Sequence, residues 1–174
     1  MRVIALTLSL LFVTSCTQPV EEISGEVISC SSLQSKTISN PITLDCLDGS
    51  TGVAINSLRG PMIINVWASW CTTCKAEMGH FRSFYEKAEG KLQLIGVDVE
   101  EASIEDGREF VLKNGMTWPN LYDSDGQSRA YFGMGVPVTW FIATDGSVAY
   151  KKIGEIKSEE ELITLTSEYL GIEI

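Results

Sequence analysis

Basic residues are scarce in this sequence. It has 13 Lys and Arg residues against 23 Asp and Glu residues, its formal net charge is -10 at pH 7, and its few basic residues form no cluster. Nucleic acids and anionic membranes attract proteins through patches of Lys and Arg. The sequence therefore argues against nucleic acid binding and against electrostatic attachment to a membrane.

The sequence is equally poor in metal ligands. His80 is the single histidine, and Cys71 and Cys74 form the single C-x-x-C motif. A structural zinc site needs four ligands, which commonly come from two such closely spaced pairs. We therefore expect no metal, and we expect His80 to be a surface or half-buried residue of a helix.

No apolar run near the N-terminus is long enough to span a bilayer. A basic Arg2 precedes a short apolar stretch from Val3 to Val13, and small residues stand just before Cys16 ("VTSC"). This pattern is typical of a secretory signal, and its end resembles the bacterial lipobox. Residues 1–15 are thus predicted to be a lipoprotein signal peptide and Cys16 to be lipid-modified. The alternative is an ordinary signal peptide that happens to contain a cysteine.

Export determines how the five cysteines are interpreted, because disulfides persist outside the cytoplasm. If Cys16 carries the lipid, four cysteines remain, and these could form three different pairings. The spacing favours a structural disulfide between Cys30 and Cys46 and a second pair between Cys71 and Cys74. Two free buried thiols are the alternative for the first pair.

The chain length of 174 residues suits one domain of ordinary size. Residues 16–28 are polar, acidic and interrupted by proline and glycine, which suits a linker between a lipid anchor and a folded domain spanning residues 29–174. Within that domain, residues 41–60 alternate apolar and polar side chains around Asp48-Gly49, and this pattern predicts a β-hairpin.

The centre of the chain alternates strand and helix patterns. Two near-continuous apolar runs, "PMIINVWAS" and "KLQLIGVDV", are typical of strands buried on both faces. Helices are predicted at 72–88, from the spacing of the apolar residues, and at 104–115, where Gly115 ends the pattern. Because strand, helix, strand and helix follow one another, the sheet should be at least partly parallel.

The C-terminal third adds two strands and a helix. Residues 137–154 form a strand pair around an Asp-Gly turn, and residues 158–170 form a helix. Ser158 is the predicted N-cap of this helix, with Glu161 completing a capping box. The sequence thus predicts an α/β fold with a mixed central sheet flanked by helices.

Two cysteines at the start of a helix suit disulfide exchange. Unpaired backbone N–H groups and the helix dipole stabilise a thiolate at Cys71, so its pKa should be lowered. We expect Cys71 to be exposed and to attack disulfides. Cys74, one turn later, should be shielded and should resolve the mixed disulfide.

Two motifs, "NVWASWCTTCKAEM" and "GVPVTWFIATDG", resemble those of the thioredoxin-like superfamily. Within it, the chain is similar over residues 41–170 to the membrane-tethered thiol-disulfide oxidoreductases of the TlpA/ResA type. The resemblance implies a thioredoxin-like fold with an N-terminal β-hairpin extension. It also implies a cis-proline at Pro137, preceded by Val136, which packs beside the active disulfide and presents backbone groups to a bound substrate.

The resemblance assigns roles to further residues. Asn65 matches a buried asparagine of this type, and Glu77 matches a glutamate that lies near the disulfide and adjusts thiol ionisation. The alternative for Glu77 is a solvated first-turn carboxylate that complements the helix dipole. Trp70 is expected to flank the site and contact substrate, and Trp67 to belong to the core.

Two departures from the family pattern concern the active-site helix. Gly79 replaces the usual proline, and glycine permits a bend without imposing one. Thr72-Thr73 stands between the cysteines, where the family often has a proline. No histidine lies between them, and this absence favours a reductant over a strong oxidant.

The resemblance therefore implies an extracytoplasmic protein thiol-disulfide oxidoreductase, acting as a reductase, with cytochrome c maturation as a candidate process. Its only redox group would be the Cys71–Cys74 disulfide, without a cofactor. Its partners would be proteins with disulfides or thiols and a membrane thiol-electron carrier, and the chain would be a lipid-anchored monomer.

Three alternatives remain. The same site could form disulfides in exported proteins as an oxidase. A thiol peroxidase is disfavoured, because Ala68 stands where peroxiredoxins have a threonine three residues before the active cysteine. A copper-binding protein is disfavoured, because the cysteine spacing is one residue short and no histidine follows His80.

Overall fold

The computed structural model describes residues 23–174 except Gln34, Thr51 and Met134, so the predicted signal peptide and Cys16 lie outside the described residues. The strands are β1 (Thr43–Cys46), β2 (Val53–Ala54), β3 (Met62–Trp67), β4 (Gln93–Val99), β5 (Asn120–Asp123), β6 (Val138–Ile142) and β7 (Val148–Ile153). The α-helices are α1 (Thr72–Ala88), α2 (Ile104–Lys113), α3 (Arg129–Phe132) and α4 (Glu159–Leu170), and 3-10 turns occur at Cys30–Ser32 and Ile55–Ser57. Among the described helices, none combines the length and the apolar character that a membrane crossing requires.

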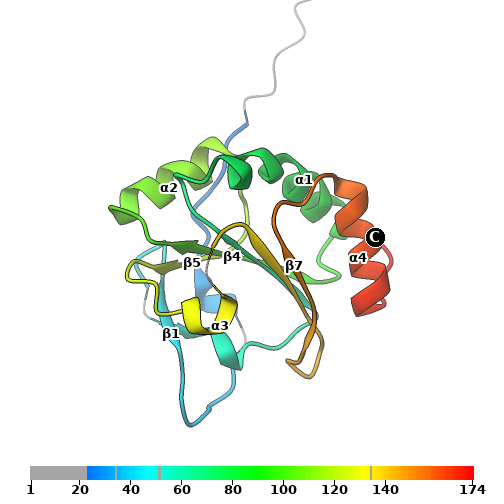
Figure 1. Ribbon diagram of the computed structural model, residues 1–174, viewed down its shortest axis with the longest axis horizontal. Coiled ribbons are helices and arrows are strands. Elements are labelled where there is room, and N and C mark those ends of the chain that lie inside the picture. Colours follow the sequence, from blue (N-terminus) through cyan, green and yellow to red (C-terminus); the bar gives the residue numbers. More distant parts are fainter. Residues whose placement is uncertain (1–22, 34, 51, 134) are drawn as a thin grey trace, which may run out of the picture.

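The strands form one mixed sheet in the order β2-β1-β5-β4-β3-β6-β7. Strands β3, β4 and β5 are parallel, and the outer strands pair antiparallel. Right-handed crossovers place α1 and α2 on the same side of the sheet. Helix α4 packs against α1, and the short α3 lies on the opposite side of the sheet (Figure 1). The predicted mixed sheet flanked by helices is confirmed.

Strand β3 leads directly into the cysteine motif. All six of its residues are buried, as the continuous apolar run predicts. Successive side chains point to opposite faces. Asn65 reaches Glu77 of α1, whereas its neighbour Val66 lies with Phe132 of α3 on the other face. Helix α1 then begins at Thr72, the residue predicted from the sequence.

The predicted N-terminal cap of α4 is confirmed in part. Ser158 caps α4 by accepting a hydrogen bond from the backbone N–H of Glu161 at 3.1 Å. The predicted capping box is nevertheless wrong, because the Glu161 carboxylate accepts from the backbone N–H of Lys157, one residue before the cap, at 2.7 Å. A complete capping box occurs instead at α2, between Ser103 and Asp106.

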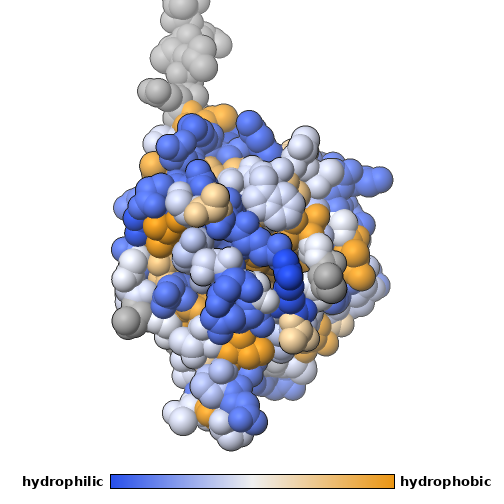
Figure 2. Space-filling view, turned by 60° about the vertical axis from the view of Figure 1, so that its left-hand side comes forward, coloured by the Kyte–Doolittle hydropathy of each residue, from blue (hydrophilic) through white to orange (hydrophobic). Residues whose placement is uncertain are grey.

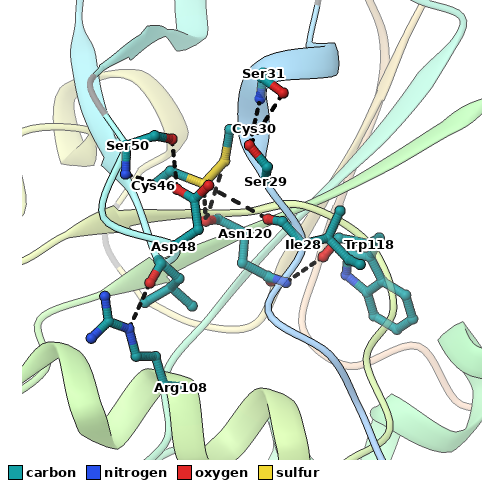
Figure 3. Close-up of a disulfide and its surroundings, with 11 residues drawn as sticks. Ile28, Ser29, Cys30, Ser31, Cys46, Asp48, Ser50, Arg108, Trp118 and Asn120 are labelled. Carbon is teal, nitrogen blue, oxygen red and sulfur yellow. Dashed lines mark hydrogen bonds between the residues drawn. A yellow bond between two sulfur atoms is a disulfide. The ribbon is translucent and has the colours of Figure 1, made fainter.

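The predicted hairpin extends the sheet at one edge. Strands β1 and β2 pair antiparallel, and β1 also pairs with β5. Figure 3 shows the disulfide between Cys30 and Cys46, with an S–S distance of 1.97 Å. Both cysteines are buried, and the sulfur of Cys46 lies 3.4 Å from the backbone oxygen of Asn120. The bond attaches the segment before the hairpin to β1.

The segment before this disulfide follows the surface of the domain. Residues 23–28 belong to the predicted linker, which spans residues 16–28. The backbone N–H of Gly25 donates to the oxygen of Leu112 at 2.8 Å, and that of Glu26 donates to the oxygen of Met116 at 2.9 Å. A Cβ added at Gly25 would lie 2.1 Å from a backbone oxygen, so only glycine permits this approach. The linker therefore meets the domain beside the end of α2.

One face of the molecule is largely polar (Figure 2). On the face shown in Figure 2, hydrophilic residues predominate and hydrophobic residues form small, separate patches. Few large hydrophobic side chains are exposed, and these include Trp70 beside the cysteine motif and Ile153 at the end of β7.

Candidate active site

Cys71 and Cys74 form a disulfide at the N-terminus of α1, with an S–S distance of 2.13 Å. Cys71 is the N-cap, and its sulfur accepts a hydrogen bond from the backbone N–H of Cys74 at 3.1 Å. No acidic residue occupies the first turn of α1. After reduction, the same N–H group and the helix dipole would stabilise a thiolate on Cys71.

Cys71 is less accessible than the sequence suggested. Cys74 is fully buried, as expected, but only 7% of the surface of Cys71 is exposed. The expectation of an exposed Cys71 was therefore wrong in degree. The N-cap geometry turns the sulfur toward the helix, and this orientation hides most of the residue.

Pro137 lies beside the end of β3. The Val136–Pro137 peptide bond is cis, and Pro137 immediately precedes β6. Strand β6 pairs with β3 so that Val138 lies opposite Val66, one residue before the end of β3. The structure thus brings the second sequence motif next to the loop that carries the cysteines.

A cavity of about 110 Å³ opens between these two motifs. Its apolar wall comprises Val66, Trp70, Val99, Phe132 and Val136. Trp70 is 58% exposed and forms one side, so a substrate chain that reaches Cys71 would meet this side chain. Trp70 and Val136, the two residues predicted to contact substrate, both line this cavity.

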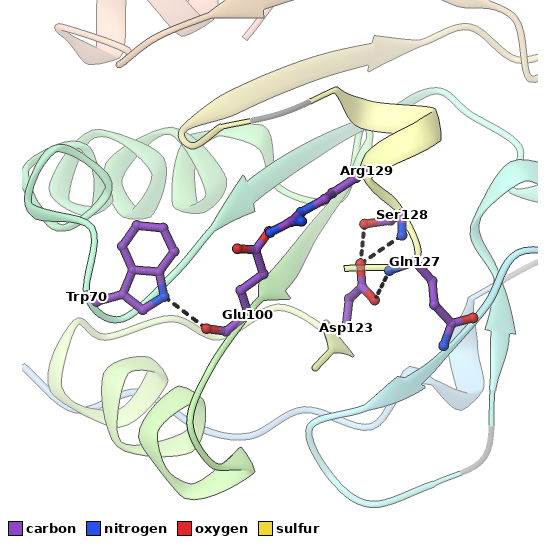
Figure 4. Close-up of polar contacts among 6 residues, drawn as sticks. All are labelled: Trp70, Glu100, Asp123, Gln127, Ser128 and Arg129. Atoms are coloured by element: carbon purple, nitrogen blue, oxygen red, sulfur yellow. Dashed lines mark hydrogen bonds and ion pairs between the residues drawn. The ribbon is translucent and has the colours of Figure 1, made fainter. Parts of the chain in front are cut away.

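A polar network closes the rim of this cavity (Figure 4). The indole N–H of Trp70 donates to the backbone oxygen of Glu100 at 3.1 Å, and the Glu100 carboxylate pairs with Arg129. The hydrogen bond from Arg129 holds the pKa of Glu100 below its usual value. Ser128 anchors the start of α3, because its backbone N–H donates to Asp123 at 2.9 Å. The sequence contains no motif that identifies these residues.

Glu77 is buried behind the disulfide. It lies one turn after Cys74 and is 1% exposed. Its two oxygens accept hydrogen bonds from the side-chain amide of Asn65 at 2.8 Å and from the backbone N–H of Ile156 at 2.7 Å. Burial raises the pKa of Glu77 to about 7, although both hydrogen bonds oppose this shift. The alternative of a solvated first-turn carboxylate is therefore wrong.

Trp67 belongs to the core, as predicted. It is fully buried, and its ring stacks on Phe110 of α2 with centroids 4.6 Å apart. Its indole N–H donates to the side-chain oxygen of Asn120 at 3.1 Å. These contacts fix the end of β3 immediately before the active-site loop.

Two further residues of α1 were considered in the sequence, Gly79 and His80. Helix α1 continues without interruption through Gly79, and nothing lies within 4 Å of a Cβ added there. His80 is half-buried. Across the described part of the chain, His, Cys, Asp and Glu form no group of three or more that could hold a metal ion.

The raised pKa of Glu77 makes stability depend on pH. The native carboxyl group retains its proton up to about pH 7, whereas the unfolded chain releases it near 4.5. The native state thus binds more protons between these values, and the free energy of unfolding must fall as pH rises through this range. Glu77→Gln should remove this dependence, so its free energy of unfolding relative to wild type should increase by up to about 3 kcal/mol between pH 4.5 and 8.

Denaturant unfolding of the oxidised protein at several pH values measures this difference. Glu86→Gln, which changes an exposed carboxylate of the same helix, is the matched control and should show no such trend. Parallel pH profiles for wild type and Glu77→Gln would contradict the shifted pKa.

The chain is similar in sequence to curated thiol-disulfide oxidoreductases. The sporulation thiol-disulfide oxidoreductase A of Bacillus subtilis is 28% identical over 102 residues, which are 56% of this chain and 62% of that protein. The thiol-disulfide oxidoreductase ResA of Bacillus thuringiensis (strain Al Hakam) is 29% identical over 111 residues, 62% of this chain and 64% of that protein. The chain thus spans less than two thirds of the length of these curated relatives.

A structural neighbour and a family model cover more of the chain. The solved structure of MTB DsbF superposes with a TM-score of 0.64 at 25% identity and covers 74% of this chain and 95% of that one. The predicted thioredoxin-like fold is thereby confirmed. The model of the AhpC/TSA family matches residues 38–151, which are more than half of the sequence. The protein therefore belongs to the AhpC/TSA family.

Proposed function

We propose that the protein is an extracytoplasmic thiol-disulfide oxidoreductase that reduces disulfides in other proteins. The observation that carries the proposal is the Cys71–Cys74 disulfide at the N-terminus of α1, beside cis-Pro137. The names of the two curated relatives support the same reaction type.

In this proposal, the reaction is divided between the two cysteines. In the reduced protein, the Cys71 thiolate attacks a substrate disulfide, forms a mixed disulfide and displaces one substrate thiolate, which takes up a proton. Cys74 then loses its proton and attacks the sulfur of Cys71. This second step releases the other substrate thiolate and restores the Cys71–Cys74 disulfide, so two electrons pass to the substrate.

Glu77 is suited to receive the proton of Cys74. Both residues lie on the buried side of α1, three positions apart, where solvent does not reach Cys74. A carboxyl group with a pKa of about 7 can bind and release a proton at neutral pH. Pro137 and Val136 would hold the substrate chain against the cavity beside Trp70.

The wider setting of the reaction is also part of the proposal. Residues 1–15 would direct export, and a lipid on Cys16 would hold the domain at a membrane as a monomer. A dithiol carrier in that membrane would reduce the Cys71–Cys74 disulfide after each cycle, and we expect this disulfide to be the only redox group of the chain. Apocytochromes awaiting haem attachment are the candidate substrates.

Substitution of the resolving cysteine tests the division of roles. In Cys74→Ser the second step is blocked, so substrate proteins should remain attached to Cys71 as mixed disulfides. Non-reducing gels and mass mapping of cell extracts would reveal these adducts, and Cys71→Ser is the matched control without adducts. Adducts on Cys74 in Cys71→Ser, with none in Cys74→Ser, would reverse the assignment of the nucleophile.

The reduction potential tests the direction of the reaction. Because no histidine lies between the cysteines and the carboxyl group of Glu77 lies behind them, we expect the Cys71 thiolate to be less stabilised than that of a strong oxidant. We expect a potential nearer to that of thioredoxin, about −270 mV, than to that of DsbA, about −120 mV. Equilibration with glutathione or dithiothreitol measures it, and Glu77→Gln should raise it modestly. A potential close to that of DsbA would favour the oxidase instead.

Membrane attachment depends on Cys16 in this proposal. Cys16→Ala should abolish incorporation of labelled fatty acid and release the domain from washed membranes, whereas Ser15→Ala, the control beside it, should remain attached. Fractionation and immunoblotting give the result. Retention of Cys16→Ala on the membrane would point to another anchor.

A further inference from the structure

Asp98 is a buried carboxyl group without a hydrogen-bond donor. It is fully buried on β4, and both of its oxygens lack a donor among the described residues. Helix α2 packs directly on it, since a Cβ added at Gly107 would lie 1.9 Å from one oxygen. Its register partner on β3 is Trp67, two residues before Ser69 in the active-site loop. An ionised carboxylate in such a place would be very costly.

Glu101 connects this region to the active-site loop. Its carboxylate accepts hydrogen bonds from the backbone N–H of Ser69 and from the Ser69 hydroxyl, the latter at 2.7 Å. Ser69 stands two residues before Cys71. Glu101 is 9% exposed, so little water competes for these bonds. The loop that sets the position of the N-cap cysteine is therefore held by one carboxylate.

The groups that face Asp98 are acidic or neutral. Glu101 approaches from the loop after β4, Asp106 from α2 and the hydroxyl of Tyr122 from β5, whereas β3 contributes only uncharged residues. Burial, followed by repulsion from Glu101, raises the pKa of Asp98 to about 9. Because Asp98 is fully buried without a donor in the described part of the chain, its carboxyl group favours the protonated form, and Glu101 is the neighbouring group with oxygens to accept that proton's hydrogen bond.

We propose that Asp98 and Glu101 form a positioning pair for Cys71, in which the protonated Asp98 donates to the Glu101 carboxylate and Glu101 holds Ser69. The inference rests on the proposed function of Cys71 as the attacking thiol. Loss of the Asp98 proton would bring two carboxylates together and drive Glu101 away from Ser69. The pH profile of Cys71 reactivity should therefore show two steps. The first comes from ionisation of the Cys71 thiol itself, and the second, at alkaline pH, comes from loss of the Asp98 proton.

Alkylation of the reduced protein by iodoacetamide, followed by peptide mass mapping between pH 5 and 10.5, reports on Cys71 without any substrate. Removal of a nearby negative charge alone lowers a thiol pKa, whereas a displaced N-cap raises it. We expect Glu101→Ala to raise the Cys71 pKa by at least about 0.5 unit, a threefold loss of thiolate below that pKa. Glu101→Gln retains an acceptor for Ser69, so the Cys71 pKa in this variant should return most of the way to the wild-type value.

Glu105→Ala is the matched control, because this carboxylate lies at the start of α2 without contacting Ser69. It should leave the Cys71 pKa unchanged or slightly lowered. Equal shifts in Glu101→Ala and Glu105→Ala would overturn the positioning role of Glu101. If Glu101→Ala does not fold, Ser69→Ala removes one of the two hydrogen bonds and should raise the pKa in the same direction by a smaller amount.

Asp98→Asn tests the second member of the pair. Asparagine retains a donor for Glu101 and cannot ionise, so the alkaline step should disappear while reactivity at neutral pH is preserved. An alkaline step that persists in Asp98→Asn, or that is absent from wild type, would overturn the role of Asp98. Reduction of a protein disulfide is measured in parallel. If the wild-type protein reduces no protein disulfide but the alkylation profiles are as expected, the proposed function is refuted and the positioning pair is still supported.

Discussion

The buried carboxyl group of Glu77 is the constraint on which the arrangement around the disulfide depends. One oxygen is bound by Asn65 of β3 and the other by the backbone of Ile156, ahead of α4. The side chain itself belongs to α1, so three elements that meet behind Cys74 are joined through one group. A carboxyl group buried in this way must keep its donors or its proton. This requirement holds the strand, the helix and the loop in a single arrangement behind the cysteines.

Two buried carboxyl groups, Glu77 and Asp98, lie near the active-site loop. Glu77 receives two hydrogen bonds, whereas Asp98 receives none among the described residues and faces another acid. This difference explains why burial raises the pKa of Glu77 to about 7 but that of Asp98 to about 9. Two similar side chains near one loop therefore differ in acidity: the pKa of Glu77 lies near neutral pH, whereas that of Asp98 lies well above it.

The elements could be predicted from local pattern, whereas the polar contacts could not. The apolar spacing of residues 72–88 defines α1, because a helix with one buried face needs that spacing. The run that contains Asp98 looks uniformly apolar, and its single acid cannot be distinguished from a residue at a strand end. The contacts of Glu101 with Ser69 and of Arg129 with Glu100 join residues about 30 positions apart, and no short motif encodes them. Likewise, the N-cap orientation that hides Cys71 is a property of the folded turn rather than of residue type.

The path of the chain before the hairpin has a mechanical consequence. A pull arriving through Ile23 would first act on the backbone hydrogen bonds of Gly25 and Glu26 with the end of α2, and next on the covalent link between Cys30 and Cys46. That link transfers tension to β1, close to the edge of the sheet and separated from β3 by β5 and β4. Helix α1, which follows Cys71 and contains Cys74, does not lie on this path. Tension from the leading segment therefore reaches α1 only indirectly, through α2, whose Phe110 stacks on Trp67, or through the successive strands β5, β4 and β3.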